Sequence, residues 1–461
     1  METRRGVHLT NWEGAIANDP SVLVDPRSVE DVVAIMRDPA SYPAPVRAVG
    51  STHHTTHCAV ATGGTVVRMM GLSRILEVGA DYVRAEAGAL YIDVAQELRR
   101  HGLQFYVNIE LGNLTMGAAS CTGTKDASFD GEFGQVASYC TAMKLVTPAG
   151  ELVEITEQDP ERMRAARSSF GLFGIVYEAT FRVKPLLAMA TDHRSYRTAE
   201  FLRELPALRA RGESMMLYLF PFLDRVGVEF RRYDATREPQ PSLLWKFRNW
   251  VWKSGAPGFG YLCTRFIPVQ RVRYAIIDYF YRIMLFVLDV LMKDRNTAAT
   301  DQMIRYPERS DWTRYTFSIW AFPEADYPEV LPGYFRFCRD YYRDHGYRCN
   351  LLNVGYRIAQ DTNCLLSYTW DSTVLTVDPV STGGPGWDDF LKAYNAWCSA
   401  GGGSPLFNQT KWTSGPQARR AFGARLDTLE TYRRQYDPED RLLNEFFAEI
   451  LRQPATARAK L

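Results

Sequence analysis

Two loops of small residues constrain most strongly how the first half of this 461-residue chain can fold. The first is Gly50-Ser51-Thr52-His53, which follows the strand-like segment PVRAVG. The second is LGNLTMGAASCTGTKD, from Leu111 to Asp126. Free N–H groups in a glycine turn form a nest for a diphosphate, and small residues let a large flat ligand approach the backbone. Two such loops, about sixty residues apart and each after a strand, therefore predict a dinucleotide site.

Helical and strand-like segments alternate around these loops up to Pro185. Residues 28–40 have the pattern of an amphipathic helix capped by Ser28, and residues 91–102 that of a helix ending at Gly102. Apolar and alternating runs predict strands at 45–50, 64–70 and 82–89, a hairpin turning at 148–150, and a closing strand at 174–185. This order predicts an α+β domain of about 185 residues.

The sequence changes in character from about residue 191 and becomes rich in aromatic residues between 240 and 300. A helix is predicted at 330–346, and a helical tail follows the glycine-rich break near residue 401. Strands are predicted at 315–322, 349–359 and 364–370.

Charge and cysteine content narrow the class of protein. Lys and Arg number 54 and Asp and Glu number 53, so net charge gives no argument for a nucleic acid or an anionic surface as partner. The eight cysteines form no CxxC pair, and the N-terminus has no signal-peptide core, so we expect reduced thiols in a cytoplasmic protein. The apolar run at 274–292 is interrupted by Asp278, Arg282 and Asp289. It therefore predicts an amphipathic or buried helix, and peripheral membrane contact is not favoured.

Three of the seven histidines, His53, His54 and His57, lie within five positions. With Cys58 they could supply four metal ligands, but adjacent residues of an extended loop point to opposite sides. A loop of surface or satisfied histidines is the second alternative. The flanking nest favours the third, a cofactor-binding loop with no metal.

Four segments resemble a known family. NWEG, PVRAVGSTHH, GNLTMGAASCTGTKD and RSSFGLFGIVYEATFRVKP are similar to the FAD-binding half of the vanillyl-alcohol oxidase / p-cresol methylhydroxylase (PCMH) superfamily. Their order is closest to the aldonolactone and alditol oxidase branch. The resemblance covers residues 10–185 and resumes at LFNQTKW and DPEDRLLNEFF. It implies an α+β fold with a two-subdomain PCMH-type FAD-binding domain at 1–188, an α+β cap at 189–415, and a segment at 416–461 that returns to the FAD domain.

The resemblance also implies roles for individual residues. In many members, the histidine at the His53 position is joined through a ring nitrogen to the 8α-methyl carbon of FAD, and a neutral imidazole is a competent nucleophile. A second link through Cys121 is a weaker alternative, because that position suits packing on the flavin. The predicted FAD-binding residues are Val49, Gly50, Ser51, Thr52, His53, His54, His57, Cys58, Leu111, Gly112, Asn113, Thr115, Met116, Ala118, Ser120, Cys121, Gly123, Thr124, Gly174, Ile175, Val176 and Lys411.

The substrate side departs from the family pattern. Lys411 would face flavin N1 and C2=O and stabilise reduced flavin, with Asn408 in the same segment. Tyr356 and Arg357 are the groups expected to manage the substrate's proton. The acid and arginine with which the alditol branch grips polyols are missing near Val354 and Tyr356. An apolar or aromatic substrate is therefore predicted.

The sequence thus predicts an FAD-dependent oxidoreductase that takes a hydride from a C–H bond of a small molecule and passes electrons to dioxygen or another acceptor. An aldonolactone or alditol oxidase and a sterol-type C=C reductase are alternative enzymes. A flavin-bearing binding protein without turnover is the alternative from another class.

Overall fold

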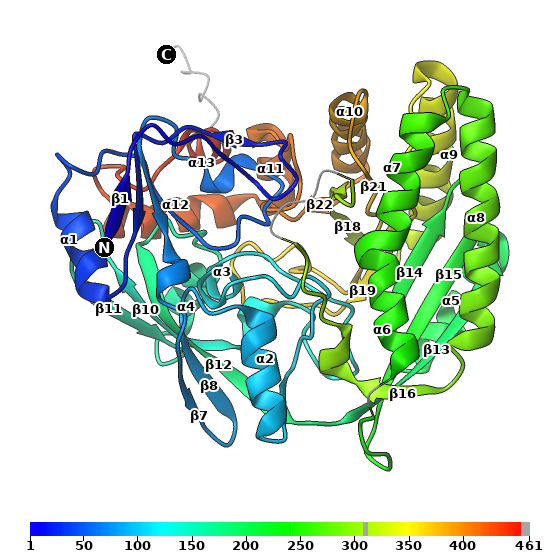
Figure 1. Cartoon of the computed structure of the whole chain (residues 1–461), viewed down its shortest axis with the longest axis horizontal. Helices are drawn as coiled ribbons and strands as arrows, with labels where there is room; N and C mark the ends of the chain where they lie inside the picture. Colours follow the sequence, from blue (N-terminus) through cyan, green and yellow to red (C-terminus); the bar gives the residue numbers. More distant parts are fainter. Residues whose placement is uncertain (241, 308–311, 453–461) are drawn as a thin grey trace, which may run out of the picture.

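The computed structural model describes residues 1–240, 242–307 and 312–452. Two bodies lie side by side in it (Figure 1). The N-terminal segments and the C-terminal helices form one body, and the middle of the chain forms the other. The site described below lies where the two bodies meet.

The N-terminal body contains two sheets. The first has the order β1-β4-β6-β5, with β4 and β5 both parallel to β6. The second has the order β11-β10-β12-β8-β7, and β9 also pairs with β12. The strands are β1 (Glu2–Arg4), β4 (Val22–Asp25), β5 (Val46–Val49), β6 (Thr65–Arg68), β7 (Ile75–Val78), β8 (Tyr82–Glu86), β9 (Leu103–Phe105), β10 (Cys140–Val146), β11 (Leu152–Thr156) and β12 (Ile175–Pro185), with the small pair β2 (Leu9–Thr10) and β3 (Ala17–Asn18).

Helices cover these sheets and close one hydrophobic core. The helices of this body are α1 (Val29–Arg37), α2 (Tyr91–Arg100), α3 (Met116–Cys121), α4 (Pro160–Ala166), α11 (Gly415–Phe422), α12 (Ala424–Tyr436) and α13 (Glu445–Leu451). Ser28 caps α1 by accepting a hydrogen bond from the Asp31 N–H, as the sequence predicts. Phe422, Leu426 and Phe447 from the C-terminal helices are buried in the same core as the early strands. The C-terminal tail is therefore part of the body that the N-terminus begins.

The middle of the chain forms an eight-stranded sheet of order β16-β13-β15-β14-β19-β20-β18-β22. Its strands are β13 (Ala188–Arg197), β14 (Ser214–Phe220), β15 (Arg225–Asp234), β16 (Arg295–Ala298), β18 (Trp320–Pro323), β19 (Asn353–Ile358), β20 (Val374–Thr376) and β22 (Ser404–Pro405), and β17 (Thr316–Phe317) pairs separately with β21 (Val380–Ser381). Its helices are α5 (Thr198–Ala210), α6 (Leu243–Trp250), α7 (Ala256–Phe266), α8 (Gln270–Leu291), α9 (Tyr327–His345) and α10 (Trp387–Ala400).

Alternation along β14 divides the helices between the two faces of this sheet. Met215, Leu217 and Leu219 pack in a core with α5, α9 and α10. Met216 and Tyr218 point to the other face and pack with α7 and α8. The second face is the one that reaches the site.

One predicted strand is wrong. Residues 364–370 form turns, because local side-chain hydrogen bonds replace strand pairing. The Thr369 N–H donates to the Ser367 hydroxyl at 3.2 Å, and the Ser367 N–H donates to the Cys364 carbonyl.

Candidate functional site

A cavity lies where three loops of the N-terminal body meet, and we call it the nest cavity. It is bordered by β5 and the residues after it up to Ala59, by residues 111–124, and by residues 170–176. Its volume is about 1000 Å³, counting the space open to solvent.

Small residues make this cavity because larger ones do not fit. A Cβ atom on Gly50 would lie 2.3 Å from Thr115 Oγ1, and one on Gly174 would lie 2.5 Å from the Val146 carbonyl oxygen. The two predicted loops are thus pressed together at Gly50 and Thr115. The Ser51 hydroxyl adds a hydrogen bond of 2.6 Å to the Asn113 carbonyl across the same junction.

Two buried side chains that the sequence analysis did not select hold the loops in place. The guanidinium of Arg47, on β5, donates to the carbonyl oxygens of Cys58, Leu442 and Phe170 at 3.1, 3.0 and 2.6 Å. Asn444 donates to the His57 and Val60 carbonyls from the C-terminal tail. The alternating pattern of a strand gives no sign of such long-range partners.

His53 lies in the lining of the nest cavity with a buried imidazole. Neither ring nitrogen has a hydrogen-bond partner among the described residues. Burial lowers the pKa of His53 to about 4, against a smaller opposing effect of the nearby Ser51 backbone, so the ring is neutral near pH 7. A buried polar group without a partner is rare and costly in proteins, and here both nitrogens of one ring remain free for a ligand.

The neighbouring histidines and cysteines have other roles. His54 Nδ1 lies 2.6 Å from the Thr56 carbonyl, and burial lowers its pKa to about 4. His57 begins a short 3-10 helix and lines neither cavity described here. Burial raises the pKa of the Cys121 thiol to about 11, which keeps the sulfur protonated and poorly nucleophilic. Within residues 1–240, 242–307 and 312–452, no three His, Cys, Asp or Glu side chains cluster as metal ligands.

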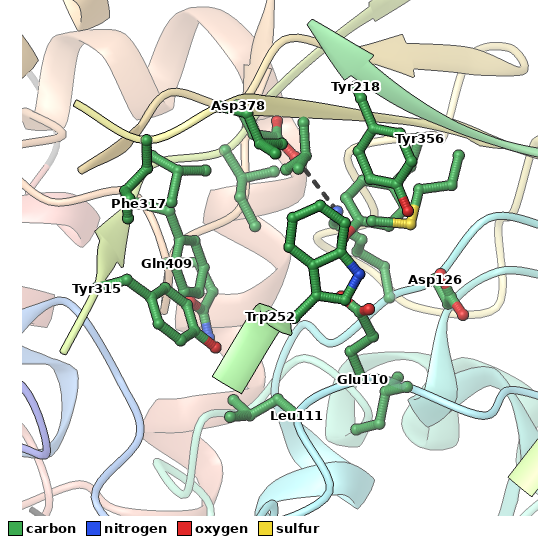
Figure 2. Close-up of a pocket in the computed structure, with 18 of the residues that line it drawn as sticks. Glu110, Leu111, Asp126, Tyr218, Trp252, Tyr315, Phe317, Tyr356, Asp378 and Gln409 are labelled. Atoms are coloured by element: carbon green, nitrogen blue, oxygen red, sulfur yellow. Dashed lines mark hydrogen bonds and ion pairs between the residues drawn. The ribbon is translucent and has the colours of Figure 1, made fainter. Parts of the chain in front are cut away.

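A second cavity adjoins the first, and we call it the cap cavity (Figure 2). Its volume is about 1070 Å³ including open space, and Leu111, Thr124 and Gln409 line both cavities. Figure 2 shows Tyr218, Tyr356 and Asp378 on one side of it, with Tyr315, Phe317 and Gln409 on the other. The helical wall comes from Trp252, Ala256, Pro257 and Tyr281.

A buried ion pair stands in the wall of the cap cavity. Lys125 Nζ lies 3.3 Å from Asp378 Oδ2 and 2.9 Å from the centre of the Tyr356 ring. Burial raises the pKa of Asp378 to about 6, against the opposing charge of Lys125. Burial lowers the pKa of Lys125, against the charge of Asp378. Both shifts move these groups toward the pH range in which a proton can be exchanged.

A larger buried network supports the same wall. Arg231 bonds Glu229 at 2.7 Å and Asp126 at 3.0 Å, and Arg248 reaches Glu229 and Glu110 at 3.1 and 2.9 Å. Burial alone would raise the pKa of Glu229, but the two guanidinium charges lower it to about 2. The Tyr218 hydroxyl also donates to Glu229, so this network fixes an aromatic residue of the cavity.

The structure brings most of the predicted cofactor residues together. The nest cavity is lined by Val49, Gly50, Ser51, Thr52, His53, His54, Cys58, Leu111, Thr115, Ala118, Cys121, Thr124, Gly174 and Val176, and also by Asn408. Gly123 lines the cap cavity. The predicted residues that line neither cavity are Gly112, Asn113, Met116, Ser120, Ile175, His57 and Lys411. Met116 and Ile175 are core residues, and Asn113 bonds the Tyr306 backbone instead.

Two of the predicted catalytic residues point away from the cavities. Tyr356 lines the cap cavity, but Arg357 follows it on β19 and therefore projects from the other face of the sheet, where it bonds Glu324. Lys411 pairs with Asp388 at 2.7 Å. Lys125 lies in the predicted motif GTKD, but the sequence did not single it out as a candidate site residue. Its partner Asp378 is far away in the chain, so the sequence gives no sign that the two side chains meet.

Comparisons with known proteins agree with this geometry. Residues 20–156 match the family described as FAD binding domain. A cholesterol oxidase from Brevibacterium sterolicum has the same fold, with a TM-score of 0.75 over 98% of this chain and 97% of that one, at 15% identity. Residues 20–156 are therefore similar to an FAD-binding domain, and the whole chain shares the α+β, two-body fold of that cholesterol oxidase, which agrees with the predicted fold class.

The sequence relatives are named as lactone oxidases and lactone dehydrogenases. L-gulono-1,4-lactone dehydrogenase of Mycobacterium tuberculosis is 27% identical over 51% of this chain and 54% of its own length. L-gulonolactone oxidase of Bos taurus is 26% identical over 54% of this chain and 55% of its length. This chain thus spans about half the length of these relatives. The predicted resemblance to the aldonolactone oxidase branch is confirmed.

Proposed function

We propose that this protein is an FAD-dependent oxidoreductase whose flavin lies in the nest cavity and whose substrate lies in the cap cavity. The observation that carries this proposal is the imidazole of His53. It is neutral and buried, both its nitrogens are free, and it lines a cavity made of glycine loops. The domain at 20–156 supports FAD as the ligand.

The protein's own residues would have distinct tasks in this reaction. FAD supplies the acceptor for a hydride from the substrate, and dioxygen or another acceptor then takes the electrons. Gly50, Thr115 and Gly174 let the backbone approach the cofactor. The Lys125–Asp378 pair would hold or take the proton of the substrate's hydroxyl group, and Tyr356 would keep Lys125 in position.

We also propose that a ring nitrogen of His53 would be bonded to the 8α-methyl carbon of the flavin. The methyl carbon and the ring would each give up one proton, the flavin ring would take the two electrons, and dioxygen or the other acceptor named above would then remove them. The neutral state of the ring supports this bond, because only a neutral imidazole has a free lone pair. The protonated thiol of Cys121 makes a second link through sulfur unfavourable.

We propose two substrate classes: first an aldonolactone, and second a molecule with an apolar body. The named relatives act on gulonolactone or arabinonolactone, which favours an aldonolactone over the apolar substrate predicted from the sequence. The walls of the cap cavity nevertheless favour a substrate with an apolar body. The lining residues Trp252, Tyr281, Tyr306, Tyr315 and Phe317 are aromatic, and all lie outside residues 20–156.

Anaerobic flavin reduction separates these proposals. L-gulono-1,4-lactone, cholesterol and NADPH would each be mixed with purified protein, and the loss of flavin colour followed. The first proposal expects bleaching by the lactone, with a slower rate in Lys125→Met and an unchanged rate in the surface control Lys392→Met. Bleaching by cholesterol alone would favour the apolar substrate, and bleaching by NADPH alone would favour a reductase. A flavin that none of a broad set of alcohols, lactones and nicotinamides reduces would reject an enzymatic role.

A further inference from the structure

The helices α6, α7 and α8 carry an apolar surface that no described part of the chain covers. On α8, exposed apolar side chains recur at Val272, Ile276, Tyr279, Ile283, Phe286 and Val290, spacings that place them on one stripe. The opposite stripe, with Ile277, Tyr281 and Leu285, packs on the sheet. An amphipathic helix in a globular protein normally has a polar outer face, so this second apolar stripe needs an explanation.

The stripe continues around the tip of a helical hairpin. Helices α7 and α8 lie over the same face of the cap sheet, and residues 267–269 join them (Figure 1). Phe266 is 70% exposed, Val269 57% and Phe286 69%. Further exposed apolar residues lie on α6, among them Phe247 and Trp250. These residues therefore form an extended apolar patch, whereas ordinary protein surfaces carry exposed apolar residues mostly one at a time.

The charged side chains on these helices that have no ion-pair partner among the described residues are positively charged. Asp278 and Asp289 are the only acidic residues within 243–291, all of which the structure describes. Asp278 pairs with Arg348, and Asp289 with His193. Arg265, Arg271 and Arg282 are exposed and pair with no described carboxylate. Arg282 follows Tyr279 by three residues and precedes Phe286 by four, so it neighbours the apolar stripe.

We propose that this face of the α6–α8 helices docks on the surface of an anionic lipid bilayer. Apolar side chains would enter the interface between headgroups and acyl chains, and the arginines would meet the anionic headgroups. A second copy of the chain fits less well. In a two-fold dimer the same patch faces itself, which would set the unpaired arginines of the two copies against one another.

The docked face is continuous with the cap cavity. Ala256 on α7 and Tyr281 on α8 line the cavity, together with Trp252 in the segment that joins α6 to α7. No helix within residues 1–240, 242–307 and 312–452 is long and apolar enough to cross a membrane. The contact proposed here lies at the membrane surface.

Vesicle flotation tests this proposal without any activity measurement. The probes are vesicles of phosphatidylcholine alone and of phosphatidylcholine with phosphatidylglycerol. We expect wild-type protein to float with the anionic vesicles at least about tenfold more tightly than with the neutral ones. The double variant Phe266→Ser/Phe286→Ser should lose about tenfold in binding to anionic vesicles. The triple variant Arg265→Gln/Arg271→Gln/Arg282→Gln should lose the preference for anionic vesicles.

The matched control is Leu152→Ser, on β11 of the other body, where Leu152 is 58% exposed. It should bind like the wild type. Circular dichroism verifies folding, and the arginine variant provides an independent result if the apolar variant is unstable. The proposal is overturned if wild-type protein floats with neither vesicle, or if Leu152→Ser loses as much binding as the apolar variant. It is also overturned if light scattering shows a wild-type dimer that the apolar variant makes monomeric.

Discussion

The imidazole of His53 lies nearly parallel to the indole of Trp12, with ring centroids 5.5 Å apart and planes inclined by 16°. Trp12 belongs to the NWEG segment, and its backbone N–H donates to the Thr52 carbonyl. The stacking supports the histidine ring from one side without using either nitrogen. The ring is thus supported while the one nitrogen that carries a lone pair in the neutral ring accepts no hydrogen bond from a described residue.

The first prediction concerns the pH dependence of flavin attachment. Because burial lowers the pKa of His53 to about 4, the ring is almost entirely neutral from about pH 6 upward. In protein prepared without flavin and then given FAD, the attachment rate should be constant from about pH 6 to about pH 9. Acid-stable colour after precipitation measures the bond. His53→Ala should lose this colour, and the exposed-histidine variant His101→Ala should keep it. A rate with a midpoint near the ordinary histidine value of about 6.5 would contradict the burial of the nucleophile.

The second prediction concerns the contact between the two glycine loops. In Gly50→Ala the new Cβ would meet Thr115, whose side chain is β-branched and stiff, so the loops must separate. We expect overpacking to cost about 1–3 kcal/mol and the bound FAD per chain to fall by at least about tenfold. Gly258→Ala is the control, because its nearest neighbour, Trp312, is 3.8 Å away. Equal FAD content in both variants would show that the nest does not depend on this contact.

The third prediction separates the ring of Tyr356 from its hydroxyl. Lys125 lies over the ring face, which Tyr356→Phe keeps and Tyr356→Leu removes. A desolvated cation–π contact contributes about 2 kcal/mol, so the leucine variant should be less stable than the phenylalanine variant by about that amount in urea unfolding. The rate of anaerobic flavin reduction in Tyr356→Phe should stay within about threefold of wild type. A loss of at least about a hundredfold in the reduction rate of Tyr356→Phe would instead make the phenol the group that handles the proton.

The fourth prediction concerns acid stability. Glu229 has a pKa of about 2 in the folded protein, below the free value of about 4.3. A lowered pKa contributes stability that is present above the free value and is lost as the pH falls toward 2. At pH 7, Glu229→Gln should lower the free energy of unfolding by about 3–5 kcal/mol, because Arg231 and Arg248 lose their buried partner. The difference from wild type should shrink between about pH 5 and about pH 2.

The control for this effect is the exposed pair of Lys392 and Asp389. Asp389→Asn should change the free energy of unfolding by no more than about 0.5 kcal/mol. Urea denaturation at several pH values measures both variants. A Glu229→Gln difference that stays constant with pH would refute the shift in pKa.

The sequence predicted correctly those features of the fold that depend on residues close together in the chain. Ser28 caps α1, and the glycine turn after Pro148 forms the hairpin of β10 and β11, because both depend on residues a few positions apart. The strand predicted at 364–370 failed for the complementary reason. Its hydroxyl residues bond their own backbone, and an apolar run cannot show that competition.

The sequence predicted two neighbouring loops of small residues, and the structure places both at one cavity. The lining of the cap cavity was not predicted, because it depends on pairs distant in sequence, such as Lys125 with Asp378. Arg357 shows the same limit. Its neighbour Tyr356 reaches the cap cavity, and alternation along β19 turns the arginine to Glu324.

The central claim is that FAD occupies the nest cavity beside His53. A visible absorption spectrum of the purified protein, combined with the amount of FAD per chain, tests it most directly. We predict a flavin spectrum with about one FAD per chain, either as purified or after incubation with FAD, and a marked decrease in Gly50→Ala but not in Gly258→Ala. Folded protein that carries no flavin and takes up none would contradict the account.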